Sequence, residues 1–189
     1  MFWVTPPWTK PPSFQRRQVI VIEPGMAFGT GSHATTRGCL EFIEKVALSL
    51  NGKPVSALDV GTGSGILAIA LAKLGVEEII ALDNDPVALK VARGNVCANG
   101  VQEQIVLSRS NLVQVRRSFP IVVANLTAET ILEVAGALER RVARRGYLIL
   151  SGILRPKAID VLRYFHSRGF RIVDRKGEKE WMTLFLRRR

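Results

Sequence analysis

The segment Leu58-Asp59-Val60-Gly61-Thr62-Gly63-Ser64-Gly65 decides the fold class of this chain. Apolar residues lead into three closely spaced glycines, and an apolar, helix-forming stretch follows them. The next apolar run, from Ile79 to Leu82, ends at the carboxylate of Asp83. A buried strand, a glycine turn, a helix and a second buried strand form the unit with which an α/β sheet binds an adenosine-containing cofactor.

The spacing of these glycines distinguishes two kinds of cofactor. In a dinucleotide-binding fingerprint the third glycine stands three positions after the second, and the loop receives a pyrophosphate. Here the glycines are Gly61, Gly63 and Gly65, and Asp59 precedes the turn. A carboxylate there would repel a phosphate but suits a ligand with an ammonium and a sulfonium group, so the segment favours S-adenosylmethionine over NAD. Asp83 suits the ribose hydroxyls of either cofactor.

The composition predicts a globular protein. The chain has 189 residues, 47% of them hydrophobic, which is enough to bury a sizeable core. No apolar run approaches the roughly 20 residues that cross a bilayer, and the first residues lack the pattern of a secretion signal. We therefore expect a cytoplasmic protein without a membrane partner. Cys39 and Cys97 lie outside any metal-ligand spacing, so they predict buried or half-buried thiols and no metal site.

The formal net charge is +11, from 27 Lys and Arg residues against 16 Asp and Glu residues. Such an excess favours a polyanionic partner such as RNA or a ribonucleoprotein. The basic residues are dispersed along the chain, and no aromatic residues alternate with them as in an RNA-binding motif. A solvated basic surface therefore explains the charge equally well.

Strands and helices alternate along most of the chain. Hydrophobic periodicity predicts strands over 19–22, 55–60, 78–83, 104–108, 121–124, 147–150, 170–175 and 181–186, and helices over 33–50, 64–74, 86–98, 127–143 and 156–167. Ser32 is expected to cap the first helix and Lys176–Glu178 to join the last two strands. This order predicts an α/β fold with a parallel, doubly wound sheet, to which a terminal hairpin adds one antiparallel strand. Residues 1–18 predict an extended Pro- and Trp-rich lead-in to one domain over 19–189.

Polar side chains near the strand ends are the candidates for chemistry. Ligands of such sheets lie outside the carboxyl ends of the strands, where the glycine loop, Asp83 and Asn125 are expected to meet. The Asn125 amide can donate and accept hydrogen bonds, so it could hold a substrate amine and the cofactor, or simply cap the following helix. His33 and Trp181 are weaker candidates, because structural roles explain them at least as well.

Methyl transfer is a displacement, so it mainly requires the acceptor and the sulfonium carbon to be held in line. A lysine acceptor must first lose a proton, which an amine with a pKa of about 10.4 resists at neutral pH. Desolvation, hydrogen bonds accepted from the neutral amine, and the positive charge of the cofactor all favour the neutral form.

Longer motifs resemble one family of bacterial methyltransferases. They are Pro24-Gly25-Met26-Ala27-Phe28-Gly29-Thr30-Gly31-Ser32-His33 with Thr35-Thr36, Asp59–Ala70, Asp83-Asn84-Asp85-Pro86, Val123-Ala124-Asn125-Leu126, Leu150–Leu154 and Glu180-Trp181. From about Trp3 to Leu186 the chain resembles the family, called PrmA, that modifies ribosomal protein L11. Many methyltransferases share the glycine loop, whereas the segments Phe28–Thr36 and Ser151–Leu154 are far more specific to this family.

The resemblance implies a class I, Rossmann-like methyltransferase with a seven-stranded, mostly parallel sheet. It implies S-adenosylmethionine as cofactor and amino groups of ribosomal protein L11 as the expected target. A loop from Phe28 to His33 would close over the cofactor, and Asn125, the candidate for positioning the substrate amine, would also contact the cofactor. Together with the glycine-loop argument, it predicts cofactor contacts from Phe28, Thr36, Asp59, Gly61, Gly63, Gly65, Asp83 and Asn125.

The chain departs from the family in several places. Family members usually begin with a separate N-terminal domain that recognises the ribosomal protein, and this chain begins at what would be the following linker. We expect either a fragment or a short form with another substrate. Glu23, Ser32, Ala34 and Leu126 stand where the family more often has Asp, Thr, Pro and Ile.

Several alternatives remain open from the sequence. Similar short enzymes methylate lysines of the electron-transfer flavoprotein beta subunit, so another protein substrate is possible. The charge motivates an RNA or small-molecule substrate, although Leu126-Thr127 replaces the Pro-Pro of the Asn-Pro-Pro-aromatic motif of amine-directed enzymes. A module that binds the cofactor without turnover is a third alternative, and a dehydrogenase is the weakest.

Overall fold

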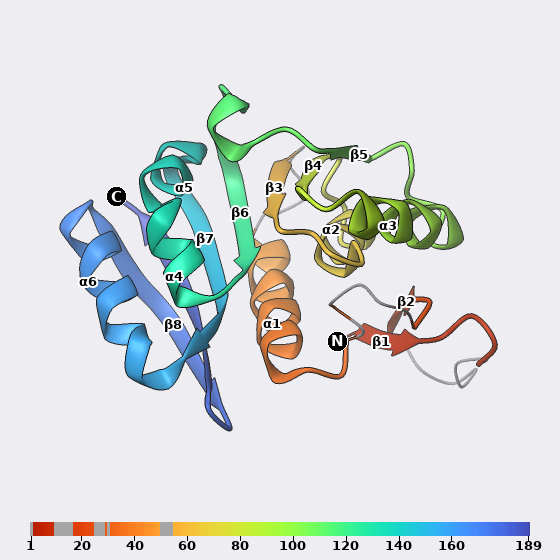
Figure 1. The fold of residues 1–189 in the computed structure, drawn as a ribbon, viewed down its shortest axis with the longest axis horizontal. Coiled ribbons are helices and arrows are strands. Elements are labelled where there is room, and N and C mark those ends of the chain that lie inside the picture. Colours follow the sequence, from red (N-terminus) through yellow and green to blue (C-terminus); the bar gives the residue numbers. More distant parts are fainter. Residues whose placement is uncertain (1, 10–16, 25–28, 30, 50–54) are drawn as a thin grey trace.

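A computed structural model describes residues 2–9, 17–24, 29, 31–49 and 55–189. Its main sheet contains β3 (Ser56–Val60), β4 (Glu78–Leu82), β5 (Ile105–Ser108), β6 (Phe119–Asn125), β7 (Val142–Leu154), β8 (Phe170–Glu178) and β9 (Trp181–Arg188). The seven strands have the order β5-β4-β3-β6-β7-β9-β8 (Figure 1). Pairs from β5 to β7 are parallel, and β9 is antiparallel to both β7 and β8. The predicted fold class, with one antiparallel strand, is confirmed.

Helices cover both faces of this sheet. The described residues form α1 (Ala34–Ser49), α2 (Ile66–Lys73), α3 (Pro86–Ala98), α4 (Ala128–Glu133), α5 (Ala135–Arg141) and α6 (Ala158–Ser167), with short 3-10 turns η1 (Leu112–Gln114) and η2 (Arg155–Lys157). In Figure 1, α2 and α3 lie to the right, α1 lies near the middle, and α4, α5 and α6 lie to the left. Among the described residues, no helix is long and apolar enough to span a membrane.

Two hydrophobic cores fill the two faces, because successive side chains of a strand point in opposite directions. Ala57 of β3 belongs to the core that includes α1 and α2, whereas Leu58 belongs to the core that includes α4 and α5. Val123 and Val122 repeat this division on β6. All four side chains are fully buried. Burial on both faces explains why the strands are continuous apolar runs in the sequence.

A second, two-stranded parallel sheet pairs β1 (Phe2–Thr5) with β2 (Gln18–Val21). The predicted lead-in therefore contains a strand, and this strand pairs across the boundary that we placed after residue 18. Asn99 fixes the small sheet to α3, because its side chain exchanges two hydrogen bonds with the Val21 backbone, at 2.9 and 2.6 Å. The small sheet thus packs on the core that includes α1 and α2, where Ile20 is fully buried.

Most element boundaries lie within two residues of the prediction, and three elements differ from it by more. The helix expected over 127–143 is divided at Val134 into α4 and α5, and the strand expected over 147–150 extends over the whole of β7. The last hairpin turns at Lys179-Glu180 rather than at Lys176–Glu178. Lys179 has a φ of 52°, whereas Gly177 has no positive φ and stays in β8. The glycine was therefore a misleading turn signal.

Two smaller expectations were also wrong. The first helix begins at Ala34, and the carbonyl of His33 accepts its first helical bond from Arg37 at 3.1 Å, so His33 occupies the capping position expected for Ser32. Cys97 is exposed, because it lies on the outer face of α3, while Cys39 is buried as expected. Burial raises the pKa of Cys39 and keeps it a thiol.

Candidate active site

A cavity of about 870 Å³ opens where the parallel strands of the main sheet end. The segments after β3, β4, β5 and β6 line it, together with the first residues of α1 and Trp181 at the start of β9. Cavities of this size accommodate small-molecule cofactors. Its place is the one at which open α/β sheets bind their ligands.

The glycine loop after β3 presents two of its three glycines to this cavity. Gly61 and Gly63 line the cavity with φ values of 73° and 54°, a region that other residues rarely adopt. Gly65 does not line the cavity: a Cβ there would lie 3.3 Å from the Cβ of Ala92 on α3. A Cβ at Gly61 would lie 2.5 Å from Cδ2 of Leu126, so the first glycine allows Leu126 to pack against the loop, and Gly65 allows α2 and α3 to pack closely.

Asp59 supports this loop from inside the protein. Its side chain is fully buried and does not line the cavity. The Thr62 hydroxyl donates a hydrogen bond of 2.6 Å to the carboxylate. Burial raises the pKa of Asp59 to about 7, against the opposing effect of hydrogen bonds from Thr62 and the Ala68 backbone. The structure thus gives Asp59 a part in shaping the loop and no open path to a ligand in the cavity.

Asp83, after β4, connects the glycine loop to the next turn. Its carboxylate accepts hydrogen bonds from the backbone N–H groups of Gly63, at 2.9 Å, and Asp85, at 3.0 Å. Each carboxylate oxygen can accept about two bonds, so both oxygens retain capacity for a ligand. Since Asp83 lines the cavity and is half-buried, it is suited to receive a pair of hydroxyl groups.

Two buried oxygens in the cavity wall have no hydrogen-bond partner in the described part of the chain. They are Oγ1 of Thr36, on α1, and Oδ1 of Asn125, at the end of β6. A buried polar atom without a partner costs about 1–3 kcal/mol, so such atoms usually mark the place of a ligand or water. Both residues line the cavity, and each oxygen can accept a hydrogen bond from a donor such as an ammonium group.

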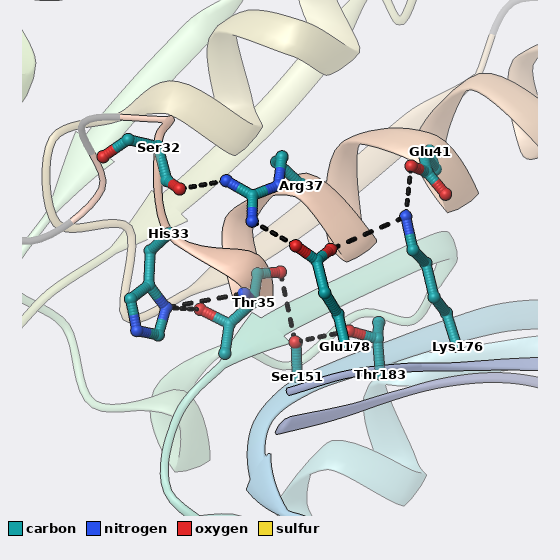
Figure 2. Close-up of polar contacts among 9 residues, drawn as sticks. All are labelled: Ser32, His33, Thr35, Arg37, Glu41, Ser151, Lys176, Glu178 and Thr183. Carbon is teal, nitrogen blue, oxygen red and sulfur yellow. Dashed lines mark hydrogen bonds and ion pairs between the residues drawn. The ribbon is translucent and has the colours of Figure 1, made fainter. Parts of the chain in front are cut away.

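Asn125 belongs to a chain of polar contacts, of which Figure 2 shows the part from Thr35 to His33. The Asn125 amide donates to Oγ1 of Thr35 at 3.2 Å, and this hydroxyl lies 2.8 Å from Nδ1 of His33. Since the hydroxyl accepts from Asn125, its own proton is available for Nδ1, which also accepts from the Thr35 backbone N–H at 3.4 Å. With Nδ1 accepting from the Thr35 backbone, the ring proton of a neutral His33 lies on Nε2.

The hairpin completes the wall opposite the glycine loop. Trp181 lines the cavity and packs edge-on against His33, with ring centroids 5.2 Å apart. The hairpin is joined to α1 by an ion pair between Arg37 and Glu178, and Lys176 bridges Glu178 and Glu41 (Figure 2). These contacts fix Trp181 relative to the first turn of α1.

Comparison with known proteins agrees with this geometry. Residues 1–189 match the model of the family described as "Ribosomal protein L11 methyltransferase (PrmA)". The chain belongs to the ribosomal protein L11 methyltransferase family. It is 44% identical over 187 residues to the ribosomal protein L11 methyltransferase of Geobacter sp. (strain M21), and the match covers 98% of this chain but 60% of that protein. The chain thus spans about three fifths of the length of such relatives.

Solved structures agree with this family assignment. A crystal structure of the ribosomal protein L11 methylase of Lactobacillus delbrueckii subsp. bulgaricus superimposes with a TM-score of 0.89 at 31% identity, covering 100% of this chain and 95% of that one. The magnesium protoporphyrin IX methyltransferase of Synechocystis, solved with bound SAM, has a TM-score of 0.65 at 20% identity, covering 82% and 81% of the two chains. The second likeness shows the fold alone, which is that of class I S-adenosylmethionine-dependent methyltransferases.

The structure places most of the predicted contact residues of this family member around one cavity. Thr36, Gly61, Gly63, Asp83 and Asn125 line it, whereas Asp59 and Gly65 do not. Phe28 lies outside the described residues. In the described part of the chain, no group of three His, Cys, Asp or Glu side chains could hold a metal ion. Contact of each residue with the cofactor remains a prediction.

Sequence reasoning missed part of the lining. The segment Arg109–Leu112 lines the cavity after β5, and its position at the end of a parallel strand was the available signal. Gly152 also lines the cavity, with a φ of 79°. A Cβ on Gly152 would lie 2.4 Å from the Leu126 carbonyl oxygen and 3.1 Å from Oδ1 of Asn125. This glycine therefore permits the backbone approach that places Asn125.

Proposed function

We propose that the chain is the catalytic part of an S-adenosylmethionine-dependent methyltransferase that modifies amino groups of ribosomal protein L11 in the cytoplasm. Its membership of the L11 methyltransferase family supports the substrate. The observation that carries the proposal is that Thr36 and Asn125, each with an unpartnered buried oxygen, line the same cavity as Asp83. Asp83 suits the ribose hydroxyl groups at one end of the cofactor. The two unpartnered oxygens suit the ammonium group at its other end.

The charges and hydrogen-bonding groups of the residues that line the cavity match those of S-adenosylmethionine as they stand in the structure. Asp83 would accept hydrogen bonds from the ribose hydroxyls, and the glycine loop would lie along the ligand at Gly61 and Gly63, which line the cavity. Thr36 and Asn125 would hold the amino-acid end through their buried oxygens. When bound, the cofactor supplies a methyl group on a positively charged sulfur.

The other cavity residues would prepare the acceptor amine. Trp181 and His33 lie on the wall opposite the glycine loop, where they would exclude water from a lysine side chain or an N-terminal amine. Desolvation favours the neutral amine, which is the nucleophile. Oδ1 of Asn125 has two acceptor sites, so beside the cofactor's ammonium group it would also accept an N–H of that amine and orient its lone pair. The amine would release its proton to solvent before it reaches the cavity, so the displacement itself would need no base.

The test combines cofactor binding with methyl transfer. Radiolabelled S-adenosylmethionine is incubated with the purified chain and purified ribosomal protein L11, and in parallel with ribosome-free extract. Label on L11 supports the proposal. Label only on another extract protein, on RNA, or on nothing despite calorimetric cofactor binding would contradict L11 as the substrate of this chain.

Asp83→Ala tests the cofactor site. Losing two charge-assisted hydrogen bonds should weaken cofactor affinity by about 3 kcal/mol or more, which is over a hundredfold in Kd. Asp160→Ala, which removes an exposed carboxylate of α6, is the matched control and should bind normally. Retained affinity in Asp83→Ala, or tight NAD binding by the original chain, would contradict the assigned pocket.

A further inference from the structure

A cluster of five arginines lies at the edge of the main sheet opposite the cavity. We call it the arginine cluster: Arg145 on β7, Arg171 on β8, Arg187 and Arg188 on β9, and Arg189. These residues line a hollow of about 360 Å³. At about 3.3 Å per residue, β7 separates the cluster from the cavity by roughly 20 Å. The arginine cluster is therefore distinct from the candidate active site.

Strand pairing brings these positive charges together. Arg171 lies directly opposite Arg187 in the antiparallel pair of β8 and β9. Like charges directly opposite each other destabilise a sheet. Among the ion pairs of the described residues, none includes a member of the arginine cluster. Repulsion without a counter-charge from the described part of the chain indicates an anionic partner.

Two of the arginines are held in place before any partner arrives. Arg187 donates from Nε to the Arg145 carbonyl at 3.1 Å, and its guanidinium lies 5.2 Å from the Tyr147 ring centroid. Arg188 donates to two backbone carbonyls at 2.7 Å each, those of Glu139 and Val142. Each guanidinium has five N–H donors, so N–H groups remain for a ligand. Pre-ordered side chains reduce the entropy cost of binding.

We propose that the arginine cluster binds the phosphodiester backbone of RNA. A guanidinium presents paired donors that match two oxygens of one phosphate. The cluster consists of arginine alone, whereas attraction to an anionic membrane would be served equally by lysine. Its hollow shape suits a strand that enters it rather than a flat surface. The proposal does not depend on the proposed methylation.

The test measures binding of a fluorescein-labelled single-stranded RNA oligonucleotide by anisotropy, between about 50 and 200 mM salt. The variant is Arg145→Asn with Arg171→Gln; both side chains are exposed, and Asn tolerates the φ of 61° at position 145. Losing two phosphate contacts should weaken binding roughly 10- to 30-fold near 100 mM salt and lower the salt slope by about 1.4. Lys90→Gln with Arg93→Gln removes two exposed charges from α3 as the control.

The control variant distinguishes binding at the arginine cluster from attraction by the net positive charge of the whole protein. If the α3 variant weakens RNA binding as much as the cluster variant does, the net charge accounts for binding and the proposal fails. It also fails if the original chain does not bind the oligonucleotide at the lowest salt, or if it binds phosphatidylserine vesicles but not RNA. Circular dichroism of both variants verifies that they are folded.

Discussion

The β8–β9 hairpin carries positive charge differently at its two ends. Beside the cavity, Arg37 and Lys176 both pair with Glu178 (Figure 2). At the opposite end, Arg171 faces Arg187, and no carboxylate among the described residues pairs with either. Since both ends belong to the same two strands, the difference lies in the side chains and not in the backbone.

This difference separates two uses of charge. Paired charges beside the cavity hold the hairpin against α1 and thereby place Trp181 and His33. The arginines at the far end form hydrogen bonds with backbone carbonyls but no ion pair with a described carboxylate, so their charges remain available to a partner. Variants that affect one end more than the other test whether this division is real.

The largest effect is expected from a matched pair of glycine substitutions at the two ends of the sheet. Gly152 and Gly169 have φ values of 79° and 83°, so Ala at either position costs about 1–2 kcal/mol of backbone strain. A Cβ at Gly169 would meet nothing within 4 Å, whereas one at Gly152 would lie 2.4 Å from the Leu126 carbonyl oxygen. Urea unfolding should show a loss of about 3 kcal/mol or more for Gly152→Ala and about 1–2 kcal/mol for Gly169→Ala.

The same pair separates stability from function. Displacing Leu126 also displaces Asn125, so Gly152→Ala should lose methyl transfer even where it is folded, and Gly169→Ala should keep it. Equal losses of stability in the two variants would mean that the close approach at Gly152 is not tight in solution.

The next largest effect is expected from the carboxyl group of Asp59, which is buried and does not line the cavity. Burial raises the pKa of Asp59 from 3.8 to about 7, so the folded state binds this proton more tightly than the unfolded chain does. Proton binding by Asp59 therefore raises the free energy of unfolding most fully below about pH 4, and this contribution is lost as the pH rises through 7. Between pH 5 and 8, the free energy of unfolding should fall by about 2–3 kcal/mol more in the original chain than in Asp59→Asn. Parallel pH profiles would show that Asp59 is ionised and solvated in the folded protein.

The central strands were the part of the fold that the sequence predicted best. Val122 and Val123 are buried on opposite faces, so their strand is a continuous apolar run that local reasoning recognises. The ends of β7 and the division at Val134 depend on contacts between distant segments, which periodicity does not contain. The hairpin turns at Lys179, whose φ of 52° is unusual for a residue other than glycine, whereas the composition favoured a turn at Gly177.

The residues of the candidate site also divide into those that could be predicted from the sequence and those that could not. Asp83 and Asn125 could be predicted because each directly follows a buried strand at the edge where parallel sheets bind ligands. The neighbours of Asn125 could not, since Thr35 and Gly152 reach it through tertiary packing. The burial of Asp59 was also hidden, because a sequence shows a carboxylate before a turn but not the direction in which it points.

The smallest effect is expected from the ion pair beside the cavity. Arg37 and Glu178 are 41% and 31% exposed, and water and salt weaken such pairs. A double-mutant cycle of Arg37→Gln and Glu178→Gln should give a coupling of about 0.2–1 kcal/mol that shrinks with added salt. Arg171→Gln at the other end should instead leave stability unchanged or raise it, because it removes repulsion from Arg187. A loss of stability in Arg171→Gln as large as in Arg37→Gln would mean that both ends use charge to hold the fold.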